Sequence, residues 1–74
     1  MSPKIGYSYY IDDNGIKYPA LISYVFNEHS PNNRYWNVNV VWLSTNGNIV
    51  AGTHQFDTTT GFVYSTPPGP PWKP

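Results

Sequence analysis

The chain has 74 residues, which is the length of one small domain, and it contains no cysteine. Disulfides and cysteine-ligated zinc are therefore excluded, and two histidines cannot complete a zinc site. Four basic and four acidic residues give a formal net charge of zero, which argues against a nucleic-acid partner because such partners normally require a basic face.

Turn motifs alternate with apolar residues along the whole chain and predict β-strands without helices. The chain has one Glu, two Ala and two Leu, whereas aromatic and β-branched residues are abundant. Segments rich in Asn, Asp, Gly and Ser separate the apolar tracts. We expect strands at residues 4–12, 16–26, 34–44, 48–56 and 62–65.

The first hairpin is expected to turn at Asn14-Gly15, as a two-residue type I′ turn. In that register Tyr9 faces Ala20 and Tyr7 faces Ile22, so the apolar residues share one face. A three-residue turn would move both tyrosines to the opposite face. The two-residue turn is therefore favoured.

The same apolar face continues through the later hairpins. Ile22 is expected to face Val38, and a three-residue loop at Thr45-Asn46-Gly47 sets the register of the third hairpin. Phe56 can then face Phe62. The predicted core face carries Ile5, Tyr7, Tyr9, Ile11, Tyr18, Ala20, Ile22, Tyr24, Phe26, Trp36, Val38, Val40, Trp42, Val50, His54, Phe56 and Phe62.

Proline and glycine positions predict bends in the strands. The missing N–H of Pro19 would point towards the third strand, so a bulge is expected near Pro19 and another near Gly52. Bent strands of about eleven residues favour a small barrel over a flat sheet. The predicted fold is an all-β antiparallel meander of four to five bent strands, a partly open barrel of SH3-like size at residues 1–66. A proline-rich extended arm follows at residues 67–74.

Strand alternation also defines an outer face, which is apolar near two hairpin tips. Soluble monomers rarely leave large apolar patches exposed. Three interpretations follow. The region is covered within the chain, by curling of the barrel or by the tail; or another protein chain covers it; or it is ordinary exposed surface. The residues predicted to form a protein interface are Tyr10, Leu21, Val41, Leu43, Ile49 and Trp72.

The rest of the outer face carries amides and hydroxyls. Amides offer paired donors and acceptors without charge, and a tyrosine ring can stack on a sugar. These properties predict, as an alternative, a carbohydrate site formed by Tyr35, Asn37, Asn39 and Gln55. An ordinary solvated sheet surface would use the same residue types.

The tail is rich in proline, which favours the polyproline II conformation. Residues 68–73 fit a P-x-x-P-x-K pattern, which aromatic grooves with an acidic rim can recognise. The other interpretation, which we favour, is a stiff arm that places Trp72 on the domain or on a neighbouring subunit.

The acid–base residues do not form a catalytic pattern. His54 is expected to face the core, and His29 lies in the 27–33 loop. The aspartates occupy turn positions, where their side chains bond to backbone. We expect no enzyme activity, cofactor or metal. With neither a signal peptide nor a run of about 20 apolar residues, the expected location is the cytoplasm or a virion, without a membrane partner.

These features together predict a non-enzymatic protein–protein interaction module, either an assembly subunit or a small inhibitor-like binder. Its partner would be another protein chain, either a different protein or a second copy. Carbohydrate binding is the alternative.

Overall fold

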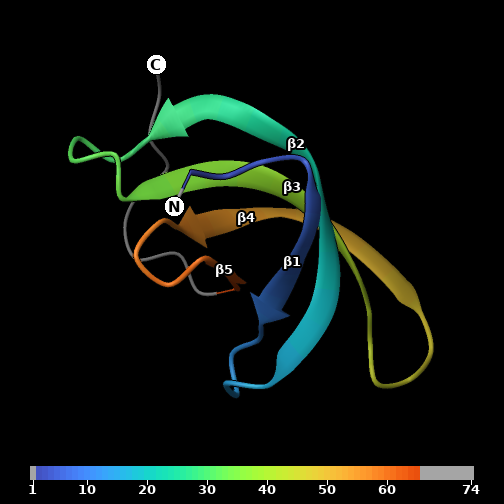
Figure 1. The fold of residues 1–74 in the computed structure, drawn as a ribbon. Helices are drawn as coiled ribbons and strands as arrows, with labels where there is room; N and C mark the ends of the chain where they lie inside the picture. Colours follow the sequence, from blue (N-terminus) through green and yellow to red (C-terminus); the bar gives the residue numbers. More distant parts are fainter. Residues whose placement is uncertain (1, 66–74) are drawn as a thin grey trace.

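A computed structural model describes residues 2–65 of the chain, and these residues form five strands (Figure 1). The strands are β1 (Gly6–Ile11), β2 (Lys17–His29), β3 (Tyr35–Leu43), β4 (Ile49–Asp57) and β5 (Phe62–Tyr64). The prediction of a small all-β meander is confirmed. The predicted proline-rich arm at residues 67–74 lies outside the described residues.

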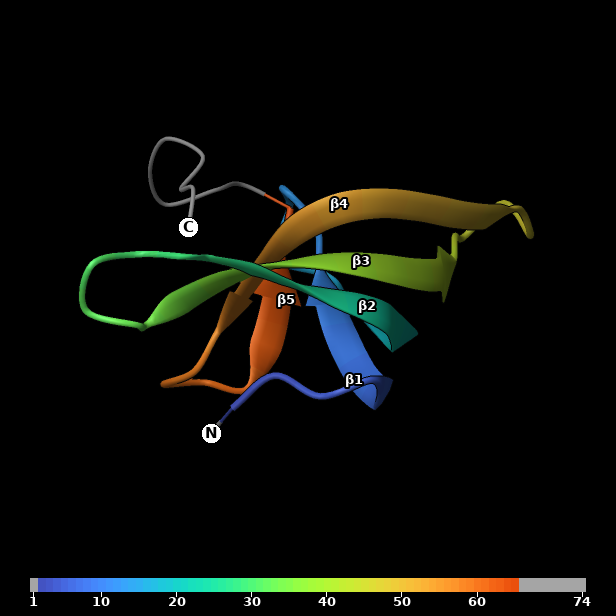
Figure 2. The ribbon, with the colours of Figure 1, turned by 90° about the horizontal axis from the view of Figure 1, so that it is seen from above.

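The five strands form a hydrogen-bonded ring in the order β1-β2-β3-β4-β5 (Figure 2). Consecutive strands are antiparallel, and the ring closes where β5 pairs with β1 in parallel. Only two pairs make this closure, Tyr10 with Val63 and Ile11 with Tyr64. The Ser65 N–H extends it with a 2.9 Å bond to the Ile11 carbonyl oxygen. Hydrogen bonds therefore close the ring at the C-terminal end of β1, whereas the N-terminal half of β1 is not paired with β5.

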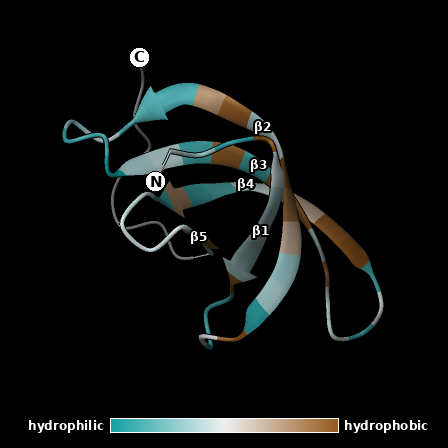
Figure 3. Ribbon diagram, in the orientation of Figure 1, coloured by the Kyte–Doolittle hydropathy of each residue, from teal (hydrophilic) through white to brown (hydrophobic). Residues whose placement is uncertain are grey.

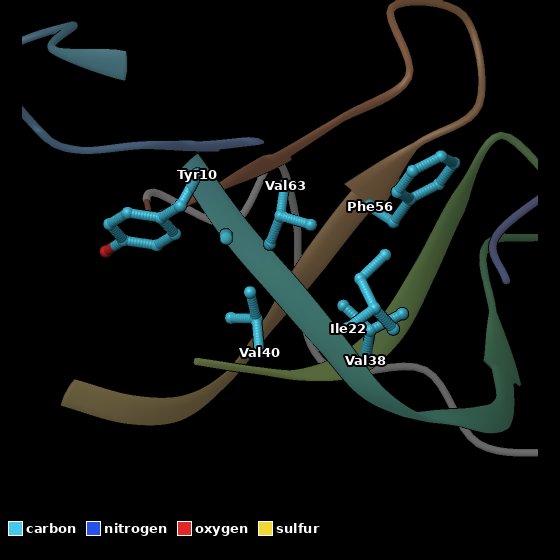
Figure 4. Close-up of a cluster of buried hydrophobic side chains, with 7 residues drawn as sticks. Tyr10, Ile22, Val38, Val40, Phe56 and Val63 are labelled. Carbon is cyan, nitrogen blue, oxygen red and sulfur yellow. The ribbon is translucent and has the colours of Figure 1, made fainter. Parts of the chain in front are cut away.

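The core lies inside the ring and draws on all five strands (Figure 4). Val38, Val40 and Val63 are completely buried. The indole of Trp42 and the ring of Tyr18 are half-buried and pack against this core. The buried hydrophobic residues are Tyr10, Ala20, Ile22, Val38, Val40, Phe56 and Val63.

The hairpin between β3 and β4 has the predicted register. Trp42 faces Val50 and Val38 faces His54, with nine consecutive residue pairs and no interruption. Gly47 closes the loop with a φ of 86°, a conformation that glycine adopts without steric cost. The bulge predicted near Gly52 is absent from this hairpin, since Gly52 faces Val40 within the regular ladder.

The first hairpin differs from the prediction by one residue. Tyr10 faces Tyr18 and Ser8 faces Ala20. The Asp12 N–H also bonds to the Ile16 carbonyl oxygen at 3.0 Å, so the loop contains three residues. The Asp12 carboxylate explains this turn, because its Oδ1 accepts 2.9 Å bonds from the N–H groups of both Asn14 and Ile16. A one-residue change of register reverses the faces of a strand. Tyr10 therefore enters the core, and Tyr7 is 74% exposed.

Strand β2 bends at a different place from the one predicted. Pro19 faces Tyr9 in regular pairing, and the register shifts instead lie between Ile22 and Tyr24 and between Val25 and His29. The first shift reverses the phase of the strand, so Val25 faces Val38 and packs against the core. Tyr24, predicted to be buried, is 53% exposed as a result.

The last hairpin is also displaced by one residue. Val63, rather than Phe62, faces Phe56 and is completely buried. The Gly61 N–H bonds to the Asp57 carbonyl oxygen at 2.7 Å, which closes a turn that is one residue longer on the β5 side than expected. Phe62 is half-buried and packs against Tyr9 instead of entering the core.

Candidate functional site

The outer apolar face consists of Leu21, Val41, Leu43, Ile49 and Ala51, on the outside of β2, β3 and β4. Leu21 faces Val41, Val41 faces Ala51, and Leu43 faces Ile49. The sheet therefore joins residues distant in sequence into two adjacent cross-strand rows. Figure 3 shows hydrophobic residues at the start of β4, beside the β3–β4 turn. Four of the six predicted interface residues lie together here.

Exposure of this face is high for apolar side chains. Leu21 is 52% exposed, Leu43 59% and Ile49 77%. Val41 is half-buried and Ala51 is exposed. In both Figures 1 and 2 the β3–β4 hairpin extends beyond the ring, so Leu43 and Ile49 lie on a projecting element. A second surface could reach them without displacing any described part of the chain.

The two other predicted interface residues do not belong to this face. Tyr10 is only 5% exposed, and its ring stacks on that of Trp42. Its assignment to the outer face is therefore wrong, because the first hairpin has a three-residue loop. Trp72 lies outside the described residues.

The predicted carbohydrate residues are brought close together, but two of them are buried. Asn37 is 7% exposed and Gln55 is 5% exposed. The Asn37 Nδ2 donates a 2.9 Å bond to Glu28 Oε1, and Gln55 Nε2 donates a longer bond of 3.4 Å to Asn37 Oδ1. Within residues 2–65, the buried Gln55 Oε1 has no hydrogen-bond partner. The expectation that Asn37 and Gln55 form an open polar surface is wrong, since β2 brings Glu28 to Asn37.

Asn39 and Tyr35 remain partly accessible but are engaged by neighbours. Asn39 Oδ1 accepts a 2.7 Å bond from Thr53 Oγ1. Asn39 and Thr53 line a hollow of about 300 Å³, which is also lined by Ser23 and Ala51. The Arg34 guanidinium lies 4.9 Å from the centre of the Tyr35 ring, a cation–π distance. Asn39 and Tyr35 therefore do not form an open sugar platform with Asn37 and Gln55.

An ion pair supports the polar end of the barrel. Arg34 Nε and Nη2 each lie 3.1 Å from a different oxygen of the Asp57 carboxylate. Burial of Asp57 by itself would raise the pKa of its carboxyl group. The bonds from Arg34 and from the Thr59 and Thr60 N–H groups outweigh that effect and lower the pKa. This ion pair joins the start of β3 to the end of β4 and has a structural role.

An aromatic groove is the surface feature that the sequence reasoning missed. It measures about 610 Å³ and lies beside the N-terminal half of β1. The predicted register placed Tyr7 and Tyr9 inside the barrel, so no exposed aromatic surface was expected there. The Asp12 side chain was the signal that could have revealed the correct turn. The lining residues are Ser2, Lys4, Tyr7, Ser8, Tyr9, Ile22, Phe56, Thr60, Gly61 and Phe62.

The histidines and acidic residues are dispersed over the barrel. His54 is half-buried and packs against the rings of both Tyr10 and Trp42, and burial lowers its pKa. His29 packs against Trp36 with its Nδ1 2.9 Å from the Ser30 carbonyl oxygen. Over residues 2–65, no three His, Asp or Glu side chains gather in a way that could hold a metal ion.

Comparison with known proteins identifies no relative. No family model, curated protein or solved structure matches the chain. Within the described part of the chain, no helix is long and apolar enough to cross a membrane. Function is therefore inferred from the surfaces of this barrel alone.

Proposed function

We propose that this chain is a non-enzymatic protein–protein interaction module that associates with a second copy through the outer apolar face. The exposed pair of Leu43 and Ile49, next to the row formed by Leu21, Val41 and Ala51, carries the proposal. None of these five residues is charged or hydrogen-bonds through its side chain. Association is the usual way to remove such a surface from water.

The composition of the described domain supports this function. Among residues 2–65, seven large hydrophobic residues are exposed, and three of them, Leu21, Leu43 and Ile49, lie on this face. Burying a leucine or isoleucine side chain contributes about 1.5–3 kcal/mol. In a symmetric pair each contact occurs twice, so the same few residues contribute from both copies.

Charge and shape favour a second copy as the occupant. The chain has a formal net charge of zero, so two copies do not repel each other through a large like charge. The face lies on three hydrogen-bonded neighbouring strands, and paired sheets pack well when such faces meet. Face-to-face packing would bring Leu43 and Ile49 of one copy against the apolar rows of the other.

Sedimentation equilibrium of the full chain tests the proposal. The wild-type chain should form dimers, and Ile49→Asp should weaken association at least about tenfold because a carboxylate would be placed in the contact. Ile16→Asp is the matched control, since Ile16 is 48% exposed in the turn of the β1–β2 hairpin. A wild-type chain that remains monomeric at high concentration, or equal effects of the two substitutions, would overturn the proposal.

A further inference from the structure

We propose that the aromatic groove binds an extended, proline-containing segment of a partner protein that carries acidic residues beside its prolines. This site shares no lining residue with the outer apolar face, although Tyr7 of the groove faces Leu21 across the β1–β2 ladder. The proposal rests on the shape of the groove, on the arrangement of its aromatic rings, on two free phenol hydroxyls and on the charge of its rim.

Small residues on β1 create the groove. In the observed register Gly6 faces Ile22 and Ser8 faces Ala20, so the inward positions of this half of β1 leave space. Strand β5 begins at Phe62 and pairs with β1 only from Tyr10 onwards. The Ser8 hydroxyl reaches across to the Gly61 carbonyl oxygen at 3.4 Å, in place of a backbone ladder. A volume of about 610 Å³ is within the usual range of ligand sites.

The floor and wall of the groove are apolar and aromatic. Ile22 and Phe56 belong to the core and line its floor. The Tyr9 ring lies edge-to-face with both Tyr7 and Phe62, at centroid distances of 6.2 and 5.9 Å. The three rings contact one another edge-to-face, so together they form one uneven aromatic wall against which a compact pyrrolidine ring can pack.

The position of Lys17 favours a proline-containing segment over single-stranded nucleic acid as the ligand of the groove. Its Nζ lies 4.5 Å from the centre of the Tyr9 ring and 5.1 Å from that of Phe62. Base stacking requires an open ring face. The ammonium group covers one face of each ring, so that face is not available to a stacking base.

The polar groups of the groove fit the backbone of a polyproline II segment. Such a segment has no internal hydrogen bonds, so its carbonyl oxygens need donors. Among residues 2–65, the hydroxyls of Tyr7 and Tyr9 have no hydrogen-bond partner and can donate to these oxygens. Aromatic grooves with hydroxyl donors recognise proline-rich segments in this way.

The positive charge at the rim of the groove favours an acidic segment. Lys4 lines the groove, Lys17 lies over its rings, and no acidic residue is among the lining residues. An Asp or Glu next to the prolines would be attracted by both ammonium groups. The chain's own proline-rich residues 66–74 contain Lys73 instead, so their charge does not match this rim.

Three peptides titrated into the isotope-labelled full chain test this inference by NMR. One is a run of prolines flanked by glutamates, the second is the same run flanked by lysines, and the third has the sequence of residues 66–74. The glutamate peptide should cause saturable shifts in the amides of Tyr7, Ser8, Gly61 and Phe62, and should bind at least about fivefold more tightly than the other two.

Two variants and one control make the test specific. Tyr9→Ala should weaken binding of the glutamate peptide at least about tenfold, because it removes the central ring of the aromatic wall. Lys4→Glu should reduce or reverse the preference for the glutamate peptide. Tyr24→Ala, which removes an exposed tyrosine outside the groove, should change nothing. Equal binding of the three peptides, tighter binding of the 66–74 peptide, or larger shifts with a single-stranded oligonucleotide would overturn the proposal.

Discussion

Tyr10 stacks on Trp42, with ring centroids 3.7 Å apart and an angle of 14° between the planes. The contact joins β1 to β3 inside the ring, although the two strands are not hydrogen-bonded neighbours. It also fixes the phase of β1, because Tyr10 can reach Trp42 only if Tyr7 and Tyr9 point away from the core. The aromatic groove therefore depends on this stack.

Replacing Tyr10 should destabilise the domain strongly. Tyr10→Ala leaves a cavity between β1 and β3 and should lower the free energy of unfolding by about 3–5 kcal/mol, the usual cost for a large buried aromatic residue. Tyr7→Ala, at an exposed position on the same strand, should change it by no more than about 0.5 kcal/mol. Urea unfolding measures both. A larger effect of Tyr7→Ala would mean that β1 has the opposite phase.

The ion pair of Arg34 and Asp57 should make stability depend on pH in acid. The pKa of Asp57 is lowered in the fold, so its contribution is present above the ordinary value of 3.8 and is lost as the pH falls through the folded value. Asp57→Asn removes the charge from a side chain that is 7% exposed and should cost about 1–3 kcal/mol at neutral pH. Unfolding of the variant should also change less between about pH 5 and pH 2. An unchanged acid dependence would contradict this account.

His54 should cause a second pH dependence nearer neutrality. Burial lowers its pKa below the ordinary 6.5, although a Ser65 backbone bond and the charge of Asp13 partly oppose that effect. The unfolded chain therefore binds a proton more readily, and stability should fall as the pH drops below about 6.5. The melting temperature followed from about pH 8 to pH 5 should show this fall, and His54→Gln should flatten it. A slope that persists in the variant would assign the effect to another group.

Replacing either of the two glycines of the β3–β4 hairpin should disturb the fold, but for different physical reasons. A methyl group at Gly47 would meet open space, but the φ of this residue is 86°, so Gly47→Ala should cost about 1–2 kcal/mol through backbone strain. Gly47→Asn should cost less, because asparagine tolerates this conformation. At Gly52 a methyl group would lie 3.0 Å from His54 Nε2, so Gly52→Ala should displace the imidazole. Thermal unfolding and the His54 NMR signals distinguish the two mechanisms, and equal cost for both Gly47 variants would exclude the strain explanation.

Strand content and the third hairpin could be predicted from sequence because local chemistry specified them. The segment Thr45-Asn46-Gly47 places glycine where a left-handed residue is required, and only one register then aligns the apolar residues on both sides. This hairpin also contributes Val41, Leu43 and Ile49, so the outward position of most of the outer apolar face followed from strand alternation. The projection of the β3–β4 hairpin, which carries Leu43 and Ile49 beyond the ring, could not be predicted from alternation, because it depends on the whole fold.

The first hairpin was less predictable because tyrosines occupy both faces of β1. Tyr7, Tyr9 and Tyr10 allow either phase to appear apolar, and counting apolar residues favoured the wrong one. The turn was decided by Asp12, whose carboxylate satisfies two backbone N–H groups. A register bulge such as the one between Ile22 and Tyr24 has no comparable local signal, since it depends on how β2 curves around β3.

Intermolecular NOEs test the association through the outer apolar face most directly. In a mixture of labelled and unlabelled full-length chains, we expect NOEs between copies that involve the methyl groups of Leu21, Leu43 and Ile49. Intermolecular NOEs confined to Ile5 or Ile16, which are exposed elsewhere, would contradict this association, as would their complete absence at concentrations that permit dimer formation.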